Sequence, residues 1–214
     1  MNVEQFSIIK ERFPWVSEVQ EKQIADLCEL YREWNAKINV ISRKDIDNVF
    51  THHILHSMSI ALFCRFADGT KVIDVGTGGG LPGIPLAILF PNVQFTLIDS
   101  IAKKIHVASE IISSLGLQNA ETFRGRAEEY KGDKGQFVVS RGAMQMDILV
   151  NISKKLIQTK EQMNALPNGV IALKGGDLQE ELKPFCKIAV EEEISNYLPN
   201  IEFFETKKIV FIPL

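Results

Sequence analysis

Residues 71–83, KVIDVGTGGGLPG, decide the fold of this chain. The stretch opens with the apolar, β-branched run 72–75, which is typical of a short buried strand. Four glycines follow within five positions, and residues 83–90 then read as an apolar helix with its prolines confined to the first turn. This order predicts a ligand cradle, because glycine lets the backbone approach a bound molecule and the N–H groups of the helix end point into the same space.

Two acids frame the glycine loop. Asp74 stands before it and gives the pattern Asp-x-Gly-x-Gly-x-Gly through Gly76, Gly78 and Gly80. A second apolar strand, residues 93–98, ends at Asp99, where an acid is placed to accept hydrogen bonds from both ribose hydroxyls of a nucleoside cofactor. The combination is typical of Rossmann-like methyltransferases that use S-adenosylmethionine, and we expect that cofactor.

Two other interpretations of the loop were weighed. Gly78, Gly80 and Gly83 satisfy the bare G-x-G-x-x-G spacing of dinucleotide-binding proteins. In those proteins the first glycine follows the strand directly, whereas Gly78 comes two residues late. A glycine loop that merely turns the chain would leave Asp74 and Asp99 unexplained.

The composition is that of an ordinary globular protein of 214 residues, enough for one sizeable core. No apolar run approaches the roughly 20 residues that span a bilayer, and the acidic N-terminus does not resemble a signal peptide. Three cysteines, far apart and odd in number, indicate neither a disulfide framework nor a metal site: Cys28, Cys64 and Cys186. We therefore expect a cytoplasmic, monomeric enzyme without a metal, in which each cysteine is a buried apolar side chain.

The net charge of −3 is unevenly distributed. Residues 175–206 carry eight acidic and two basic residues, so the remainder of the chain has a net charge of +3. This pattern permits a basic face away from an acidic C-terminal edge.

Strands and helices alternate from residue 71 onward. The expected strands are 71–75, 93–98, 120–123, 136–140 and 168–173, and the expected helices are 83–90, 101–115, 145–157 and 177–184. Buried β-branched runs in this alternation predict a doubly wound, mostly parallel sheet, closed at one edge by an antiparallel pair at 188–194 and 208–212. We expect residues 69–214 to form this α/β core and residues 1–68 to form a helical extension packed on it.

The extension is expected to contain helices at 4–13, 17–34 and 49–66. Tyr31 and Trp34 belong to an apolar stripe and are expected in the core against the sheet, although aromatic rings could also stack on nucleobases. His52, His53 and His56 share the last helix. No third ligand accompanies their helical spacing, so hydrogen-bonded histidines near the mouth of the cofactor site are favoured over a metal site.

Ligands of such sheets bind at the carboxyl ends of the strands, so the residues just after each strand are site candidates. Leu81 ends the glycine loop, and Ala127 and Glu128 follow the third strand as candidates for adenine contact, although Glu128 could equally be a solvated acid. Ser140 and Arg141 follow the fourth strand, where the transferable methyl is expected. That position lacks the Asn/Asp-Pro-Pro-aromatic turn of amino-methylating enzymes, a cysteine nucleophile and a metal-binding acid cluster.

The remaining chemistry needs neither a nucleophile nor a base from the protein. Guanine N7 fits, because its lone pair carries no proton, and catalysis then consists of alignment. Arg141 is the expected orienting group, with paired hydrogen bonds to guanine O6 as its specific role and a structural ion pair as the alternative. Basic residues near the same rim are candidates for binding RNA phosphates, or are simply solvated charges: Arg43, Lys44, Lys103, Lys104, Arg126 and Lys174.

These residues resemble the RsmG (GidB) family of bacterial 16S ribosomal RNA guanine-N7 methyltransferases. The resemblance lies in the loop 72–86, in residues 95–100 followed by Lys103-Lys104, in Ser140-Arg141 and in residues 172–175. It implies an S-adenosylmethionine-dependent enzyme whose cofactor contacts lie at the positions of Gly76, Leu81, Ala127, Glu128 and Arg141. Its implied partner is 16S rRNA, the small ribosomal subunit or a precursor, with no membrane partner.

Two positions depart from the family pattern. Gly79 stands where the family usually has proline, which predicts a looser loop, and Gly142-Ala143 replace the usual Ala-Phe, which removes an aromatic ring from the substrate side. Three alternative functions stay open on the sequence: a methyltransferase of a protein or small molecule, a non-catalytic nucleoside-binding module, and an oxidoreductase.

Overall fold

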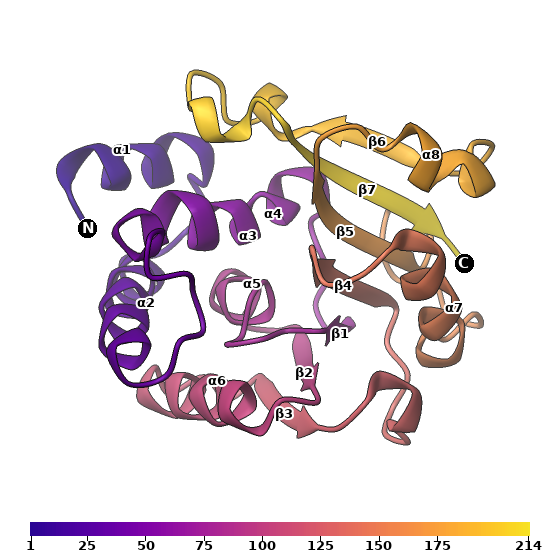
Figure 1. Cartoon of the computed structure of the whole chain (residues 1–214), viewed down its shortest axis with the longest axis horizontal. Coiled ribbons are helices and arrows are strands. Elements are labelled where there is room, and N and C mark those ends of the chain that lie inside the picture. Colours follow the sequence, from indigo (N-terminus) through magenta and orange to yellow (C-terminus); the bar gives the residue numbers. More distant parts are fainter.

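A seven-stranded sheet of order β3-β2-β1-β4-β5-β7-β6 forms the centre of the molecule (Figure 1). The computed structural model describes residues 1–214. Five strands are parallel: β1 (Lys71–Val75), β2 (Gln94–Asp99), β3 (Ala120–Arg124), β4 (Phe137–Arg141) and β5 (Gly169–Gly175). The strand β7 (Lys207–Pro213) runs antiparallel between β5 and the edge strand β6 (Val190–Glu193). The predicted mostly parallel sheet with an antiparallel edge is confirmed.

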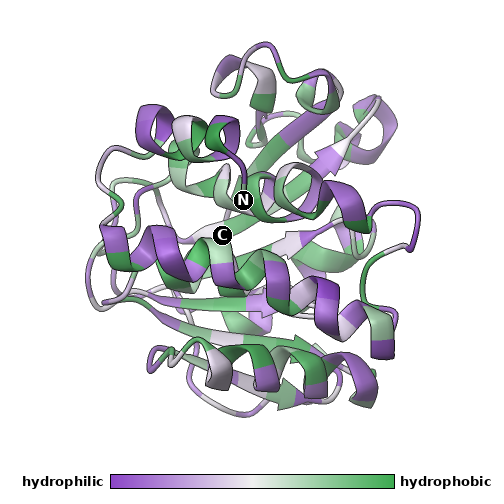
Figure 2. Ribbon diagram, turned by 90° about the vertical axis from the view of Figure 1, so that its left-hand side faces the viewer, coloured by the Kyte–Doolittle hydropathy of each residue, from purple (hydrophilic) through white to green (hydrophobic).

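Helices cover both faces of this sheet. The helices α5 (Gly83–Leu89) and α6 (Ala102–Ser114) pack on one face, and α7 (Met146–Leu156) and α8 (Gln179–Leu182) pack on the other. Alternate residues of β1 point to opposite faces, so Val72 joins the larger apolar cluster while Ile73 and Val75 join the smaller one. Figure 2 shows hydrophobic residues on the strands and hydrophilic residues on the outer sides of the helices. The chain order reverses between β1 and β4, which places the switch point of the sheet at their carboxyl ends.

The N-terminal helices form a further layer. Both α1 (Val3–Arg12) and α2 (Glu18–Lys37) begin with a capping box, at Asn2 and Ser17. We expected the apolar stripe of α2 to lie on the sheet, but α2 packs on α5 and α6, because those helices already cover that sheet face. Gln20 Nε2 donates to the carbonyl oxygen of Ile88 over 2.7 Å and ties α2 to the end of α5.

The expected helix at 49–66 is not one regular α-helix. After the 3₁₀ turn η1 (Ile46–Asn48) come the π-helical turns η2 (Val49–Leu55), then α3 (His56–Met58) and α4 (Ile60–Phe63). The wider π turn allows two consecutive histidines, His52 and His53, to reach the same carboxylate of Asp45. Consecutive side chains of an α-helix diverge by about 100°, so α-helical periodicity could not predict this arrangement.

The C-terminal elements are shorter than expected. The helix predicted at 177–184 is α8 followed by the 3₁₀ turn η4 (Lys183–Phe185), and the strand predicted at 188–194 is β6 alone. Cys28 and Cys64 are buried as expected, and burial raises their pKa values to about 11 and about 12. Cys186 is exposed, which corrects the expectation for that residue, because it follows the short η4 turn at the surface. None of the helices combines the length and the apolar character that a membrane crossing needs.

Candidate active site

Asp74, at the end of β1, supports the glycine loop through two hydrogen bonds. Its side chain is fully buried, and Oδ2 accepts hydrogen bonds from the Gly83 N–H over 2.8 Å and from the Thr77 hydroxyl over 2.6 Å. Burial raises the pKa of Asp74 to about 7, although those two hydrogen bonds oppose the shift. The structure thus gives Asp74 a supporting position under the loop, and its other oxygen, Oδ1, has no partner.

The loop glycines are required by backbone geometry. Gly76, Gly78 and Gly80 have φ values of +72°, +58° and +106°, which L side chains rarely adopt. A Cβ on Gly76 would come within 2.7 Å of Ala143 Cβ, in the loop after β4. The backbones of these two loops are therefore in close approach at the switch point.

Gly79 contacts two residues of the N-terminal segment, and the expectation of a looser loop stays a prediction. Its carbonyl oxygen accepts a hydrogen bond from the hydroxyl of Tyr31 over 3.0 Å, and Val40 packs against its Cα side. Tyr31 is fully buried, and this burial raises its pKa, so the hydroxyl stays protonated as a donor. Tyr31 is thus a core residue as expected, and it links α2 directly to the loop.

Asp99, at the end of β2, lies next to the glycine loop. Its Oδ2 accepts the Gly78 N–H over 2.9 Å, and its Oδ1 accepts the Ile101 N–H over 2.8 Å. These bonds fix the direction of the carboxylate, and each oxygen keeps one lone pair for a further donor. Asp99 also lines the smaller of two neighbouring cavities at these strand ends.

A cavity of about 290 Å³ lies over these strand ends. It brings together four of the predicted cofactor residues and one predicted phosphate-binding residue, which are Gly76, Asp99, Ala127 and Glu128, with Arg126. Ala127 is buried and begins the 3₁₀ turn η3 (Ala127–Glu129), whereas Glu128 is exposed. Ile98 of β2 and Ile148 and Ile152 of α7 add apolar side chains to the lining. An apolar lining with one carboxylate suits the adenine and ribose of a nucleoside, so the residues present fit S-adenosylmethionine.

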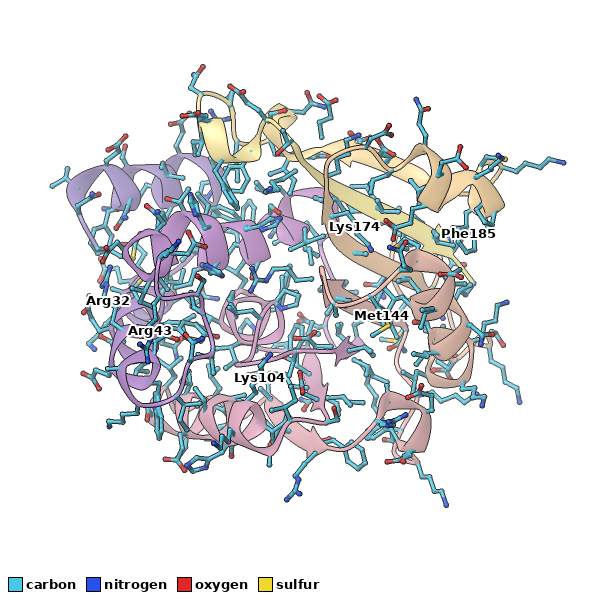
Figure 3. The ribbon with its side chains drawn as sticks, viewed as in Figure 1. Arg32, Arg43, Lys104, Met144, Lys174 and Phe185 are labelled. Carbon is cyan, nitrogen blue, oxygen red and sulfur yellow. The ribbon has the colours of Figure 1, made fainter.

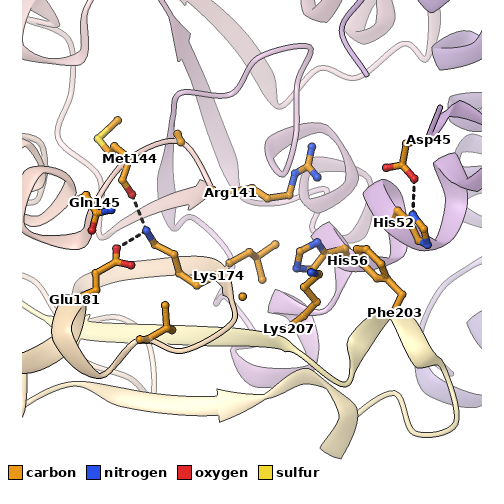
Figure 4. Close-up of a pocket in the computed structure, with 15 residues that line it drawn as sticks. Asp45, His52, His56, Arg141, Met144, Gln145, Lys174, Glu181, Phe203 and Lys207 are labelled. Carbon is orange, nitrogen blue, oxygen red and sulfur yellow. Dashed lines mark hydrogen bonds and ion pairs between the residues drawn. The ribbon is translucent and has the colours of Figure 1, made fainter. Parts of the chain in front are cut away.

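A second, larger cavity of about 630 Å³ adjoins the first, and Met144 lines both. Figure 4 shows Arg141 at its centre, with His56, His52 and Phe203 on one side and Lys174 with Glu181 on the other. Arg141 ends β4, one residue after Ser140, whose hydroxyl donates to the carbonyl oxygen of Val75 over 2.8 Å. That bond joins the tips of β4 and β1, so Arg141 stands beside the glycine loop.

Arg141 is held by a chain of hydrogen bonds. Its Nη1 donates to His53 Nδ1 over 3.1 Å, and His53 Nε2 in turn donates to Asp45 Oδ2 over 2.6 Å. Burial, and then the positive charge of Arg141, lower the pKa of His53 to about 4, so the ring is neutral at pH 7. Burial raises the pKa of Asp45, but the hydrogen bonds from His52 and His53 outweigh it and leave that pKa below its usual value.

An aromatic stack forms one wall of the larger cavity. The rings of His52 and Phe203 lie 3.9 Å apart at 13°, and Lys207 Nζ lies 4.9 Å from the centroid of Phe203. Phe203 belongs to the 3₁₀ turn η6 (Glu202–Phe204). The C-terminal segment thus supplies an aromatic ring to a cavity in which Gly142 and Ala143 provide none.

Lys174 occupies the other wall. Its ammonium donates to Glu181 Oε1 and to the carbonyl oxygen of Met144, each over 2.6 Å. The same Glu181 oxygen accepts the Met146 N–H, so Lys174 and Glu181 together fix the loop that carries Met144. Two of the three Lys174 donors are therefore used within the protein.

The remaining predicted basic residues lie outside the two cavities. Arg43 and Lys44 are exposed in the loop between α2 and η1, while Lys103 and Lys104 begin α6 (Figure 3). The Lys104 side chain reaches Gly78, where an added Cβ would lie 3.9 Å from Lys104 Cδ. Lys37, Lys103 and Lys104 surround a separate hollow of about 400 Å³. Leu81 is buried at the base of the glycine loop and lines neither cavity.

Several residues of the site were not predicted from the sequence. No sequence motif marks five of them, which are Thr77, Asp45, Phe203, Lys207 and Glu181. The histidines were the exception, because their spacing indicated hydrogen-bonded rings near the mouth of the cofactor site. No cluster of three or more His, Cys, Asp or Glu side chains is arranged to hold a metal ion. Trp34, a candidate for base stacking, is half-buried and packs its edge against His106.

The family model described as "rRNA small subunit methyltransferase G" (GidB) matches residues 20–198. The chain belongs to this family. It is 53% identical over 207 residues to the Ribosomal RNA small subunit methyltransferase G of Porphyromonas gingivalis, covering 97% of this chain and 93% of that protein. It is 51% identical over 202 residues to the protein of the same name from Flavobacterium johnsoniae, covering 94% of this chain and 95% of that protein.

Solved structures of lower identity share the fold. A mutant of MtNAS in complex with S-adenosylmethionine superposes with a TM-score of 0.56 at 13% identity, covering 100% of this chain and 79% of that one. An rRNA methylase from Streptococcus thermophilus gives a TM-score of 0.50 at 13% identity, covering 75% and 95%. With the family match, these findings confirm the predicted family, the Rossmann-like methyltransferase fold and the assignment as an S-adenosylmethionine-dependent rRNA methyltransferase.

Proposed function

We propose that this protein transfers a methyl group from S-adenosylmethionine to N7 of a guanine in 16S ribosomal RNA, acting in the cytoplasm as a monomer without a metal ion. Membership of the rRNA small subunit methyltransferase G family supports the RNA substrate. The position of Arg141 in the larger cavity, which adjoins the smaller one at Met144, is the observation that carries the choice of atom.

The smaller cavity holds the cofactor in this proposal. Asp99 accepts the ribose hydroxyls with its two remaining lone pairs, and the Ala127 backbone and Glu128 lie where the adenine edge is expected. Gly76 lines the same cavity, and the proposal places the methionine portion along it. When bound, S-adenosylmethionine supplies an activated methyl carbon, which forms a bond to guanine N7 while the S–C bond breaks and its electron pair stays on sulfur.

The larger cavity holds the target base. The guanidinium of Arg141 stays protonated in proteins, so it donates hydrogen bonds and accepts none. Nη1 is committed to His53, while Nε is buried without a partner in this structure. A donor in that position bonds guanine O6, which is adjacent to N7, and would oppose the amino group that adenine carries at the same place.

Methylation of N7 requires neither a general base nor a nucleophile from the wall of the cavity. Guanine N7 has no proton to remove, so a general base is unnecessary, and no cysteine lies near the cavity. His53 is neutral, but its Nδ1 is occupied by Arg141 and its Nε2 by Asp45. The protein's contribution is therefore orientation, which can supply about 7–11 kcal/mol of the barrier.

The exposed basic residues offer a surface for the RNA backbone. Arg43 and Lys44 lie on the loop that leads from α2 to the histidine segment, and Lys104 lies beside the glycine loop (Figure 3). We assign phosphate contacts to these residues, of which Lys104 is half-buried, and to the exposed Lys103 and Arg126. Lys174, tied to Glu181 and the Met144 carbonyl oxygen, contributes at most one remaining donor.

The test is methylation of defined RNA by the purified protein. Radiolabelled S-adenosylmethionine is incubated with naked 16S rRNA and with small subunits, and the labelled nucleoside is identified by chromatography. The proposal expects 7-methylguanosine in one of the two substrates. Label in another nucleoside would overturn the choice of N7, and label only in protein would favour a protein methyltransferase. Stabilisation by NAD instead of S-adenosylmethionine in a thermal-shift assay would favour an oxidoreductase.

A further inference from the structure

His56 is a buried polar side chain whose ring nitrogens make no hydrogen bond of normal geometry within the protein, and the His52 backbone has only the weakest influence on its pKa. It is 6% exposed, and neither Nδ1 nor Nε2 has a hydrogen-bond partner. An unsatisfied buried polar group lowers the stability of a protein, so such groups usually serve a purpose outside the fold. His56 differs in this respect from His53, whose two nitrogens are both bonded.

The surroundings of His56 point toward the substrate cavity. The residue lines the larger cavity together with Arg141 and Lys207, as Figure 4 shows. The rings of Phe203 and Phe204 pack edge-on against the imidazole, with centroids 5.5 Å and 5.9 Å away. These aromatic contacts fix the ring without offering a hydrogen bond. A base reaching the ring nitrogens must move the half-buried Phe203 aside.

A second unsatisfied group belongs to Arg141, which lines the same cavity. Arg141 Nε is buried and has no partner, although Nη1 of the same guanidinium is bonded. The cavity thus contains one unpaired donor on Arg141 and one unpaired donor and one unpaired acceptor on the neutral ring of His56. A ligand with adjacent acceptor and donor atoms along one edge would satisfy this set.

We propose that His56 is a specificity-determining residue that recognises the Watson–Crick edge of the target guanine while Arg141 bonds O6. This inference rests on the proposed function of the same cavity. Guanine presents N7, O6 and N1–H in sequence around its ring. With N7 directed to the cofactor cavity and O6 at Arg141, the N1–H is the next atom along and donates to the unprotonated nitrogen of His56. Burial lowers the pKa of His56 to about 3, which keeps that nitrogen available as an acceptor at pH 7.

The proposal predicts opposite effects on stability and activity for one substitution. His56→Phe preserves a flat ring of similar size but removes the two unsatisfied nitrogens. We expect this variant to melt at or above the temperature of the wild type, because no hydrogen bond is lost in the free protein. We expect its kcat/KM on 16S rRNA or small subunits to fall at least tenfold, with the Kd for S-adenosylmethionine unchanged.

Two further variants sharpen the experiment. His56→Gln keeps a neutral donor and acceptor and is expected to recover part of the lost kcat/KM. His106→Phe makes the same chemical change on α6, outside both cavities, and is expected to leave the rate within twofold. A purely structural role for His56 would instead lower the melting temperature, the cofactor affinity and the rate together.

The outcomes separate this inference from the proposed function. If the wild type yields 7-methylguanosine and His56→Phe retains its kcat/KM within twofold, the role of His56 is overturned and the proposed function stands. A His56→Phe variant that melts at a lower temperature and loses cofactor affinity also overturns that role. If the wild type yields no 7-methylguanosine, the proposed function fails, and the role of His56 fails with it.

Discussion

Arg141 donates from Nη1 to Nδ1 of His53 over 3.1 Å, and this bond decides which nitrogen of the imidazole carries the proton. Because a guanidinium has no acceptor, Nδ1 of His53 must be unprotonated and the proton must lie on Nε2, facing Asp45. Asp45, His53 and Arg141 therefore act as one unit, in which a carboxylate near the surface orients a guanidinium at the strand tip.

The first prediction concerns this unit. Asp45→Asn and His53→Leu are each expected to lower kcat/KM roughly tenfold, because the guanidinium loses its fixed orientation. The double variant is expected to lose little more than either single variant, since the residues act through the same group. Rates of the four proteins in a double-mutant cycle provide the measurement. Independent, additive losses would show that the two residues do not act through Arg141.

The second prediction is that Arg141→Ala lowers kcat by about 10²-fold or more, a loss typical of removing one oriented donor from an active site. Arg141→Lys is expected to restore little activity, because an ammonium lacks the planar fork. The matched control is Arg32→Ala, which removes an exposed arginine of α2 paired only with Glu29. Circular dichroism checks the fold, and full turnover by a folded Arg141→Ala protein would refute the orienting role.

The third prediction separates the charge of Asp74 from its hydrogen bonds. Asp74→Ala leaves the Gly83 N–H and the Thr77 hydroxyl without an acceptor and is expected to lower the free energy of unfolding by about 2–4 kcal/mol. Asp74→Asn keeps an acceptor oxygen and is expected to cost less than about 1.5 kcal/mol, because the carboxyl pKa is already raised to about 7 by burial. Urea denaturation at pH 7 measures both, and equal losses would contradict the supporting role of the side chain.

The fourth prediction is a dependence of stability on pH. Burial lowers the pKa values of His53 to about 4 and of His56 to about 3, below the value of about 6.5 expected in the unfolded chain. Below pH 6.5 the unfolded chain therefore binds more protons, and the free energy of unfolding falls as the pH falls. Each histidine contributes up to about 1.4 kcal/mol per pH unit until its folded pKa is reached.

His56→Phe isolates one of these contributions. The variant is expected to gain stability over the wild type progressively between pH 6.5 and pH 4.5 in urea titrations. A stability difference that stays constant over this interval would show that His56 is not held neutral in the folded protein.

The sequence predicted the elements that depend on local pattern. The strand-loop-helix unit at 71–90, the position of Asp99 and the doubly wound, mostly parallel sheet follow from glycine spacing, apolar runs and the right-handed crossover rule. Gly76, Asp99, Ala127 and Glu128 lie around one cavity as predicted, because each follows a strand whose carboxyl end meets the others at the switch point.

The second cavity could not be predicted in the same way. Phe203 and His52 stack although they are far apart in the sequence. The position of η6 beside the histidines depends on the pairing of β7 with β5, which is a long-range contact. The π-helical turns at 49–55 also shift the histidines off the faces that an α-helix would give them. Pairing of Lys174 with Glu181 depends on the position of α8 relative to β5, which no motif specifies.

The most direct test of the account is a crystal structure of the protein with S-adenosylmethionine bound. The account predicts the ribose hydroxyls within hydrogen-bond distance of the Asp99 carboxylate, the adenine beside Ala127, and the methyl carbon directed past Gly76 toward Arg141. S-adenosylmethionine bound elsewhere, or bound with its methyl carbon directed away from the Arg141 cavity, would contradict it.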